Sequence, residues 1–138
     1  MAQRATAVTL FALAGLHVAW GRGSSFPFSD PDDLGDAVIG RTSVPSPAAC
    51  FAVAGALTIA GALVADVPRL PRGVQHLGVT GVGLVLATRA GLGFSGRTDA
   101  VSRGSVSTRF RRLDRRLYSP LCLALAAGAM TSRRPTRR

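Results

Sequence analysis

The sequence contains no lysine and no glutamate: all 17 basic residues are arginine and all seven acidic residues are aspartate. This bias is typical of a GC-rich coding sequence, so the missing lysine says nothing about mechanism. The two cysteines, Cys50 and Cys122, are too few for a disulfide scaffold and lack CxxC or metal-ligand spacing. The sequence does not decide whether they lie close together. Because it also lacks a phosphate-binding loop and any recognised catalytic motif, we expect no metal, no cofactor and no catalytic residue.

The chain is both apolar and strongly basic, with 47% hydrophobic residues and a formal net charge of +10. Its arginines lie in connections and in a tail, beside apolar runs, which is the usual composition of the flanks of membrane spans. We therefore predict that the partner is a lipid bilayer and that the chain does not bind nucleic acid, although its charge alone would allow it.

Four apolar runs predict four transmembrane helices. The strongest, residues 47–65, has about 19 residues without a charge, close to the length that crosses a bilayer core. The predicted spans are residues 5–21, 47–65, 74–94 and 117–132. The remaining segments are predicted to be loops 22–46, 66–73 and 95–116, the last one basic, and a basic tail 133–138. Helices satisfy every backbone group in lipid, so we predict a single all-α domain, an integral membrane antiparallel four-helix bundle.

Three spans remain an alternative, if the first or the last run is not inserted. The first run also has the charged start and apolar stretch of a signal peptide, but no clean cleavage site follows it. The first loop is rich in proline, serine and aspartate, which predicts irregular structure. Its four aspartates lack the glycine and the terminal glutamate of a calcium-binding EF-hand loop, so they are expected to be solvated.

If the helices alternate in direction, five polar or aromatic residues meet at one membrane face. These candidate ligand-binding residues are His17, Trp20, Arg89, Asp114 and Tyr118. Arg89 lies about five residues inside its span, so it starts roughly 7–8 Å below the boundary at the helical rise per residue. It either extends to the headgroups or pairs with Asp114, the acid close to the start of the fourth span. His17, Trp20 and Tyr118 are either site residues or structural and interfacial ones.

Three patterns in the chain resemble a known family. They are H-x-x-W-G at His17–Gly21, R-A-G-L-G at Arg89–Gly93, and F-x-x-x-D-x-x-x-Y-S-P-L-C at Phe110–Cys122. Together they resemble the small bacterial membrane family catalogued as domain of unknown function 3995. The resemblance implies a four-helix integral membrane protein and no assigned activity. Here Arg22 interrupts the glycine pair expected after the tryptophan.

Three classes of function follow from these observations. The leading expectation is a multi-pass cell-membrane protein that binds a lipid headgroup or small ligand in a polar pocket at one face. The second is a structural subunit, or a homo-oligomer, that docks through small-residue faces such as Ala48, Ala52, Ala56 and Ala60. The third is a membrane enzyme that uses His17 or Asp114 for proton transfer.

Membrane orientation is not decided by arginine counting, because one face has seven arginines and the other nine. The acidic loop lies on the face opposite the termini, so we expect the termini in the cytoplasm.

Overall fold

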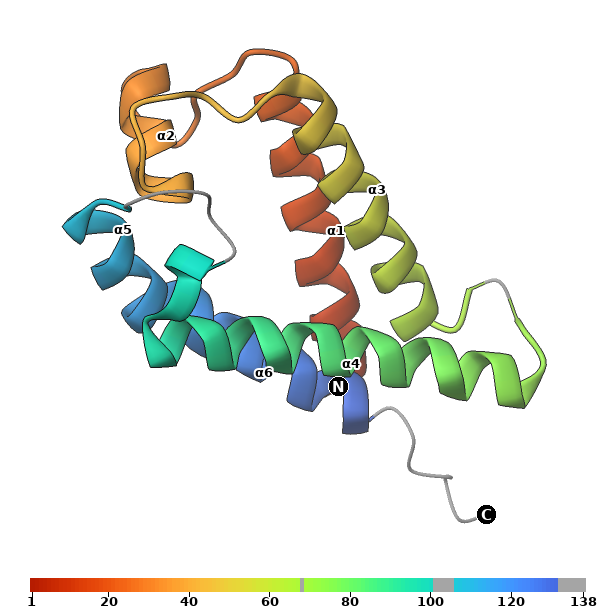
Figure 1. Cartoon of the computed structure of the whole chain (residues 1–138). Coiled ribbons are helices and arrows are strands. Elements are labelled where there is room, and N and C mark those ends of the chain that lie inside the picture. Colours follow the sequence, from red (N-terminus) through yellow and green to blue (C-terminus); the bar gives the residue numbers. More distant parts are fainter. Residues whose placement is uncertain (68, 101–105, 132–138) are drawn as a thin grey trace.

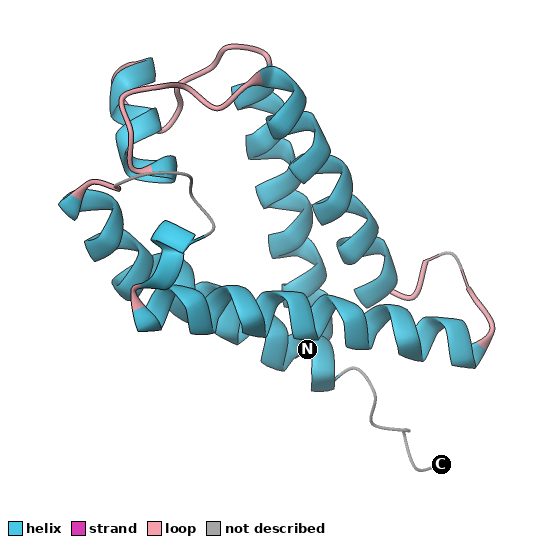
Figure 2. Cartoon of the chain, viewed as in Figure 1, coloured by secondary structure: helices cyan, strands magenta, loops and turns pink. Residues whose placement is uncertain are grey.

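The computed structural model describes residues 1–67, 69–100 and 106–131. All regular structure within these ranges is helical (Figure 2). The α-helices are α1 (Ala2–Gly21), α2 (Pro31–Ile39), α3 (Pro47–Val64), α4 (Arg72–Ser95), α5 (Thr108–Leu113) and α6 (Ser119–Thr131). A 3-10 turn, η1 (Arg97–Ala100), follows α4, and a π-helical turn, η2 (Asp114–Tyr118), joins α5 to α6. The predicted all-α class is confirmed for the described residues.

Each of the four apolar runs forms a helix, namely α1, α3, α4 and α6. Two of these, α3 and α4, are long and apolar enough to cross a membrane. The start of α3 follows the local rules for a helix N-terminus: the Ser46 hydroxyl accepts a hydrogen bond from the Ala49 amide, and Pro47 occupies the first turn.

The four helices are arranged as two antiparallel pairs that cross each other (Figure 1). α1 lies along α3, and α4 lies along α6, with the beginning of α1 and the end of α3 meeting the second pair. At that junction α1 approaches α6 closely, because a Cβ at Gly128 would overlap Thr6 Oγ1 and lie 3.2 Å from Thr6 Cβ. Small residues permit this kind of close helix contact.

The main apolar core lies at this junction. Leu10 of α1 and Val64 of α3 are fully buried there, and Val79 of α4 and Leu125 of α6 complete the contact. All four long helical segments therefore contribute to one core, and none of them is an appendage.

Segment 22–46 was expected to be an irregular loop and segment 95–116 a basic loop, whereas both contain helix. The first contains α2, where the Asp30 carboxylate caps the Asp33 amide, Pro31 stands in the first turn, and Gly40 ends the helix at a φ of 74°. The second contains η1 and α5, and the Ser107 hydroxyl caps α5 by accepting from the Phe110 amide.

The helical path from α5 through η2 to α6 is continuous, so the last helical segment begins well before the predicted position 117. Pro120 lies inside this path and has no backbone N–H to donate. The wide turn comes directly before it, and the Ser119 amide there donates to Asp114 O, one residue further back than in an α-helix. Pro120 interrupts the regular series of backbone hydrogen bonds, and the π turn accommodates this interruption without breaking the helical path.

Candidate functional site

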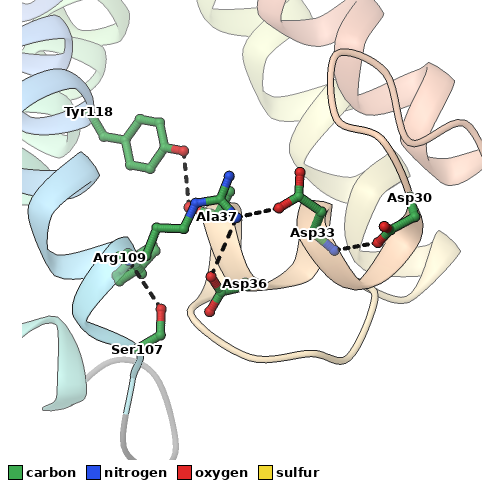
Figure 3. A network of polar contacts seen from close by, with 8 residues as sticks. Asp30, Asp33, Asp36, Ala37, Ser107, Arg109 and Tyr118 are labelled. Atoms are coloured by element: carbon green, nitrogen blue, oxygen red, sulfur yellow. Dashed lines mark hydrogen bonds and ion pairs between the residues drawn. The ribbon is translucent and has the colours of Figure 1, made fainter.

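Helix α2 is held against α5 by a small polar network (Figure 3). The Arg109 guanidinium forms a salt bridge with Asp33, and it lies 3.6 Å from Asp36 Oδ2. The Tyr118 hydroxyl donates to the Ala37 carbonyl over 3.0 Å. Two of the four aspartates that were expected to be solvated, Asp33 and Asp36, therefore help attach segment 22–46 to the helical path that leads into α6.

The hydrogen bond from Arg109 lowers the pKa of Asp33 below its ordinary value of 3.8. The charge of Arg109 acts in the same direction, while partial desolvation acts against it. The ionised carboxylate is therefore the form that supports the attachment of α2.

A half-buried ion pair joins the end of α4 to the π turn. Arg89 Nη2 lies 2.8 Å from Asp114 Oδ1, and the Asp114 side chain is only 1% exposed. The hydroxyl of Ser119, which is fully buried, donates to the same Oδ1 over 3.3 Å. Of the two arrangements open for Arg89, pairing with Asp114 and extension to the headgroups, the structure has the pair.

Gly93 lets α4 come close enough for this cluster to form. A Cβ at that position would overlap Ser119 Oγ and lie 2.8 Å from Asp114 Oδ1. The cluster consequently depends on a backbone surface of α4, in addition to the charged side chain one turn earlier.

The ion pair leaves part of its hydrogen-bonding capacity unused. Arg89 Nη1 and Asp114 Oδ2 are buried and have no hydrogen-bond partner within the described part of the chain. Buried polar atoms are rarely left unpaired. One donor group and one acceptor oxygen of the pair are therefore not used by any described residue.

His17 and Trp20 form a separate cluster at the end of α1. Their ring centroids are 4.8 Å apart, and His17 Nδ1 lies 2.8 Å from the Leu13 carbonyl. Trp20 Nε1 donates to the Phe26 carbonyl over 2.7 Å, while its ring packs with Leu34 of α2. The cluster therefore attaches segment 22–46 to the end of α1, through the contact of the Trp20 ring with α2.

The five candidate ligand-binding residues thus occupy three places. Arg89 and Asp114 are bonded to each other, Tyr118 reaches α2, and His17 and Trp20 lie together on α1. No hydrogen bond or ion pair between described residues joins the α1 cluster to the ion pair. Both cysteines are free thiols: Cys50 packs in the cluster with Trp20, and Cys122 lies on α6.

Sequence reasoning missed two sets of residues. One is the attachment of Asp33, Asp36 and Arg109, although the cap signature of α2 was readable in the sequence. The other is an open pocket of about 400 Å³ on the outer side of the π turn. It is lined by four arginines, namely Arg111, Arg112, Arg115 and Arg116. Their spacing at i, i+1, i+4 and i+5 on a continuing helix was the available signal.

Within the described ranges, no three His, Cys, Asp or Glu side chains gather in a way that could hold a metal ion. The chemistry that the described side chains offer is that of charged and hydrogen-bonding groups.

Comparison with protein families gives one match. The model of the family described as protein of unknown function (DUF3995) matches residues 10–129. The chain belongs to this family. The matched DUF3995 region includes His17, Arg89 and the whole path from α5 to the last turns of α6. Neither the curated proteins nor the solved structures contain a match to the chain.

Proposed function

We propose that this DUF3995 protein is a multi-pass integral membrane protein that binds a lipid headgroup or a small polar ligand at one membrane face. The observation that carries the membrane location is the poor burial of its most apolar helices. Only 22% of the apolar window of α3, and 22% of that of α4, is buried inside the protein. The core helix of a water-soluble protein has most of its apolar surface covered.

The uncovered surface of these helices is made of large aliphatic and aromatic side chains. Ile59 on α3 is 64% exposed, and Leu77 and Val85 on α4 are 74% and 69% exposed. In water, an apolar surface spread over two helices would favour aggregation. A bilayer covers it without a protein partner.

In this proposal α1, α3, α4 and α6 cross the bilayer, and the arginines of α5 and η2 lie at its surface. Two crossing pairs can both span when each pair tilts away from the membrane normal, as transmembrane helices commonly do. The termini then share one side, assigned to the cytoplasm, and segments 22–46 and 95–116 share the other.

The proposed topology is tested by labelling single cysteines in a chain in which Cys50 and Cys122 are replaced by alanine. The introduced positions are Ala2, Ser24, Val67, Arg97 and Thr131, all in described segments near helix ends. In intact cells an impermeant maleimide should label the cysteines at 24 and 97, and label the other three only after lysis. Labelling of position 2 together with 24 would mean that α1 does not span. Release of the protein by alkaline carbonate would contradict membrane integration altogether.

The ligand part of the proposal rests on the unused donor and acceptor of the Arg89–Asp114 pair. It is tested with Arg89→Ala, Asp114→Ala and the double variant, purified in a neutral detergent. Loss of a co-purifying polar lipid in both single variants, measured by mass spectrometry, supports the site. Wild-type lipid content and wild-type stability in both single variants would contradict it.

A structural subunit is the second candidate, and one observation favours it. Ala48, Ala52 and Ala56 lie exposed along α3, and no atom is within 4 Å of a Cβ built at Gly55. This flat surface is not used inside the chain and suits close packing with another helix. Co-purification of a stoichiometric membrane partner, lost in Ala52→Leu but kept in Val53→Leu, would support this alternative.

A further inference from the structure

The arginine pocket lies where the polar and apolar parts of one helical path meet. Arg111, Arg112, Arg115 and Arg116 stand on α5 and η2, and the exposed apolar residue Leu117 follows at once. Residues four apart on a helix share a face. Pairs 111–115 and 112–116 therefore place four guanidinium groups over little more than one turn.

Three of the four pocket arginines have no counter-charge among the described carboxylates. Arg112, Arg115 and Arg116 have no ion pair with any described carboxylate, while the nearby Asp114 is buried and bonded to Arg89. Arg109, on the same path, is occupied by Asp33 and Asp36. Like charges this close repel each other, and an anion that binds between them relieves the repulsion.

Arg115, one of the pocket arginines, lies beside the end of α4. Arg115 Nη2 lies 2.8 Å from the position of a Cβ at Gly96, the glycine that ends α4 with a φ of 71°. A guanidinium at a helix C-terminus is favoured by the helix dipole. Arg115 is thus placed where the end of α4 favours its positive charge.

The same helical face continues as an exposed apolar strip beyond the arginines. After Arg116, this face continues along the helix in steps of three or four residues. It contains Pro120, Leu123, Ala124 and Ala127, all exposed. A strongly basic pocket followed by an apolar strip is complementary to an anionic amphiphile.

We infer that the Arg111–Arg116 pocket binds the phosphate group of an anionic lipid, with an acyl chain along the exposed face of α6. Guanidinium groups form paired hydrogen bonds with two oxygens of one phosphate, which gives both affinity and orientation. A volume of about 400 Å³ is within the range of small-ligand sites, roughly 300–1,000 Å³. A free phosphate has the same chemistry, but it would not use the apolar strip. This inference deepens the proposed membrane function and rests on it for the source of the phosphate.

The experiment uses the full chain in nanodiscs of neutral phosphatidylcholine. Phosphatidic acid is added to the discs in one arm, and inorganic phosphate is titrated from solution in the other. Three Gln substitutions, Arg112→Gln, Arg115→Gln and Arg116→Gln, are combined in the test variant. The control carries Arg22→Gln, Arg69→Gln and Arg72→Gln, which removes the same charge from positions outside the pocket.

We expect saturable, one-to-one binding of phosphatidic acid that is at least about tenfold weaker in the test variant than in the control. A third variant, Arg112→Lys, Arg115→Lys and Arg116→Lys, keeps the charge but removes the paired hydrogen bonds. It should also bind more weakly than the wild type, and it provides the comparison if the Gln variant does not fold.

Equal binding in wild type and the Lys variant would overturn the site, because nonspecific attraction to the membrane would then explain the data. Equal losses in the test and control variants would overturn it too. Saturable binding of inorganic phosphate without a preference for the lipid would keep the anion site but overturn the lipid assignment. If the topology labelling fails, the membrane proposal is wrong. The titration with inorganic phosphate then tests by itself whether the pocket binds an anion.

Discussion

At the scale of single residues, the buried cluster between α4 and the π turn depends on one absent side chain. Gly93 faces Ser119 and Asp114 directly, whereas no atom lies within 4 Å of the position that a Cβ at Gly91 would take. The two glycines stand two residues apart on the same helix and differ in what they face. They form a matched pair for testing how much the close approach of the helices contributes.

We predict that Gly93→Ala destabilises the protein by about 1–3 kcal/mol, because the new methyl group must push Ser119 and Asp114 away from α4. Gly91→Ala should be neutral or stabilising by up to about 1 kcal/mol, because alanine favours the helix and meets nothing. Urea titration in a mild detergent, followed by circular dichroism, measures both. Equal stability of the two variants would show that α4 and the π turn are not in this close contact.

Part of this residue-scale detail was predictable. The pairing of Arg89 with Asp114 was one of two expectations, because a charge inside an apolar run needs either a partner or an exit. The roles of Gly93 and Ser119 were not predictable, since sequence spacing does not show which faces of two helices meet. Whether His17, Trp20 and Tyr118 serve a ligand stays a prediction.

At the scale of elements, α2 is the least expected feature, and its attachment to α5 is expected to depend on pH. The long helices were predictable because apolar runs of this length have few alternatives. The composition of segment 22–46 does not indicate α2, because proline, serine and aspartate are common in loops, although Asp30 and Pro31 are favourable residues for starting a helix. Its attachment to α5 relies on exposed charges, which titrate.

We predict that α2 detaches from α5 in acid. The pKa of Asp33 is lower in the folded state than its ordinary 3.8, so its contribution to docking is complete above that value. That contribution is lost as pH falls through the folded-state pKa, below 3.8. Trp20, the only tryptophan, packs with Leu34 of α2, so its fluorescence should shift in this window.

The control for this titration is Asp33→Asn, which cannot ionise. It should already show weakened docking at neutral pH, and the acid step in tryptophan emission should shrink. An unchanged step in Asp33→Asn would assign the transition to another group.

At the scale of the whole molecule, the crossing of two helix pairs decides where the polar clusters lie. The short connection joins α3 to α4, which belong to different pairs, so connection length does not predict which helices lie side by side. The angle between the pairs depends on how side chains fit at the junction, and composition does not contain that information. The crossing explains why His17 and Arg89 lie in separate clusters, although both are near the ends of their helices.

We predict that this junction is the main source of tertiary stability. Leu10→Ala, at a fully buried position shared by the four long segments, should cost about 2–5 kcal/mol through the cavity it leaves. Val8→Ala on the same helix removes a side chain that is 66% exposed, and it should change stability by less than about 0.5 kcal/mol. Denaturant unfolding in detergent compares them, and a similar cost for both would place the core elsewhere.

The π turn at Asp114–Tyr118 also bears on how this chain tolerates insertions and deletions. A π turn holds about one residue more than the α-helical turn it replaces. Deleting a single residue there would convert the turn to a regular α-helical one and leave the segments on either side in nearly the same orientation, because the extra residue is accommodated within the turn itself. The same deletion in an α-helical part of the path would rotate everything before it by about 100° relative to everything after it. The arginines would then no longer align with the apolar face of α6. A one-residue deletion should therefore preserve the helix arrangement within Asp114–Tyr118 and disturb it in the α-helical turns on either side.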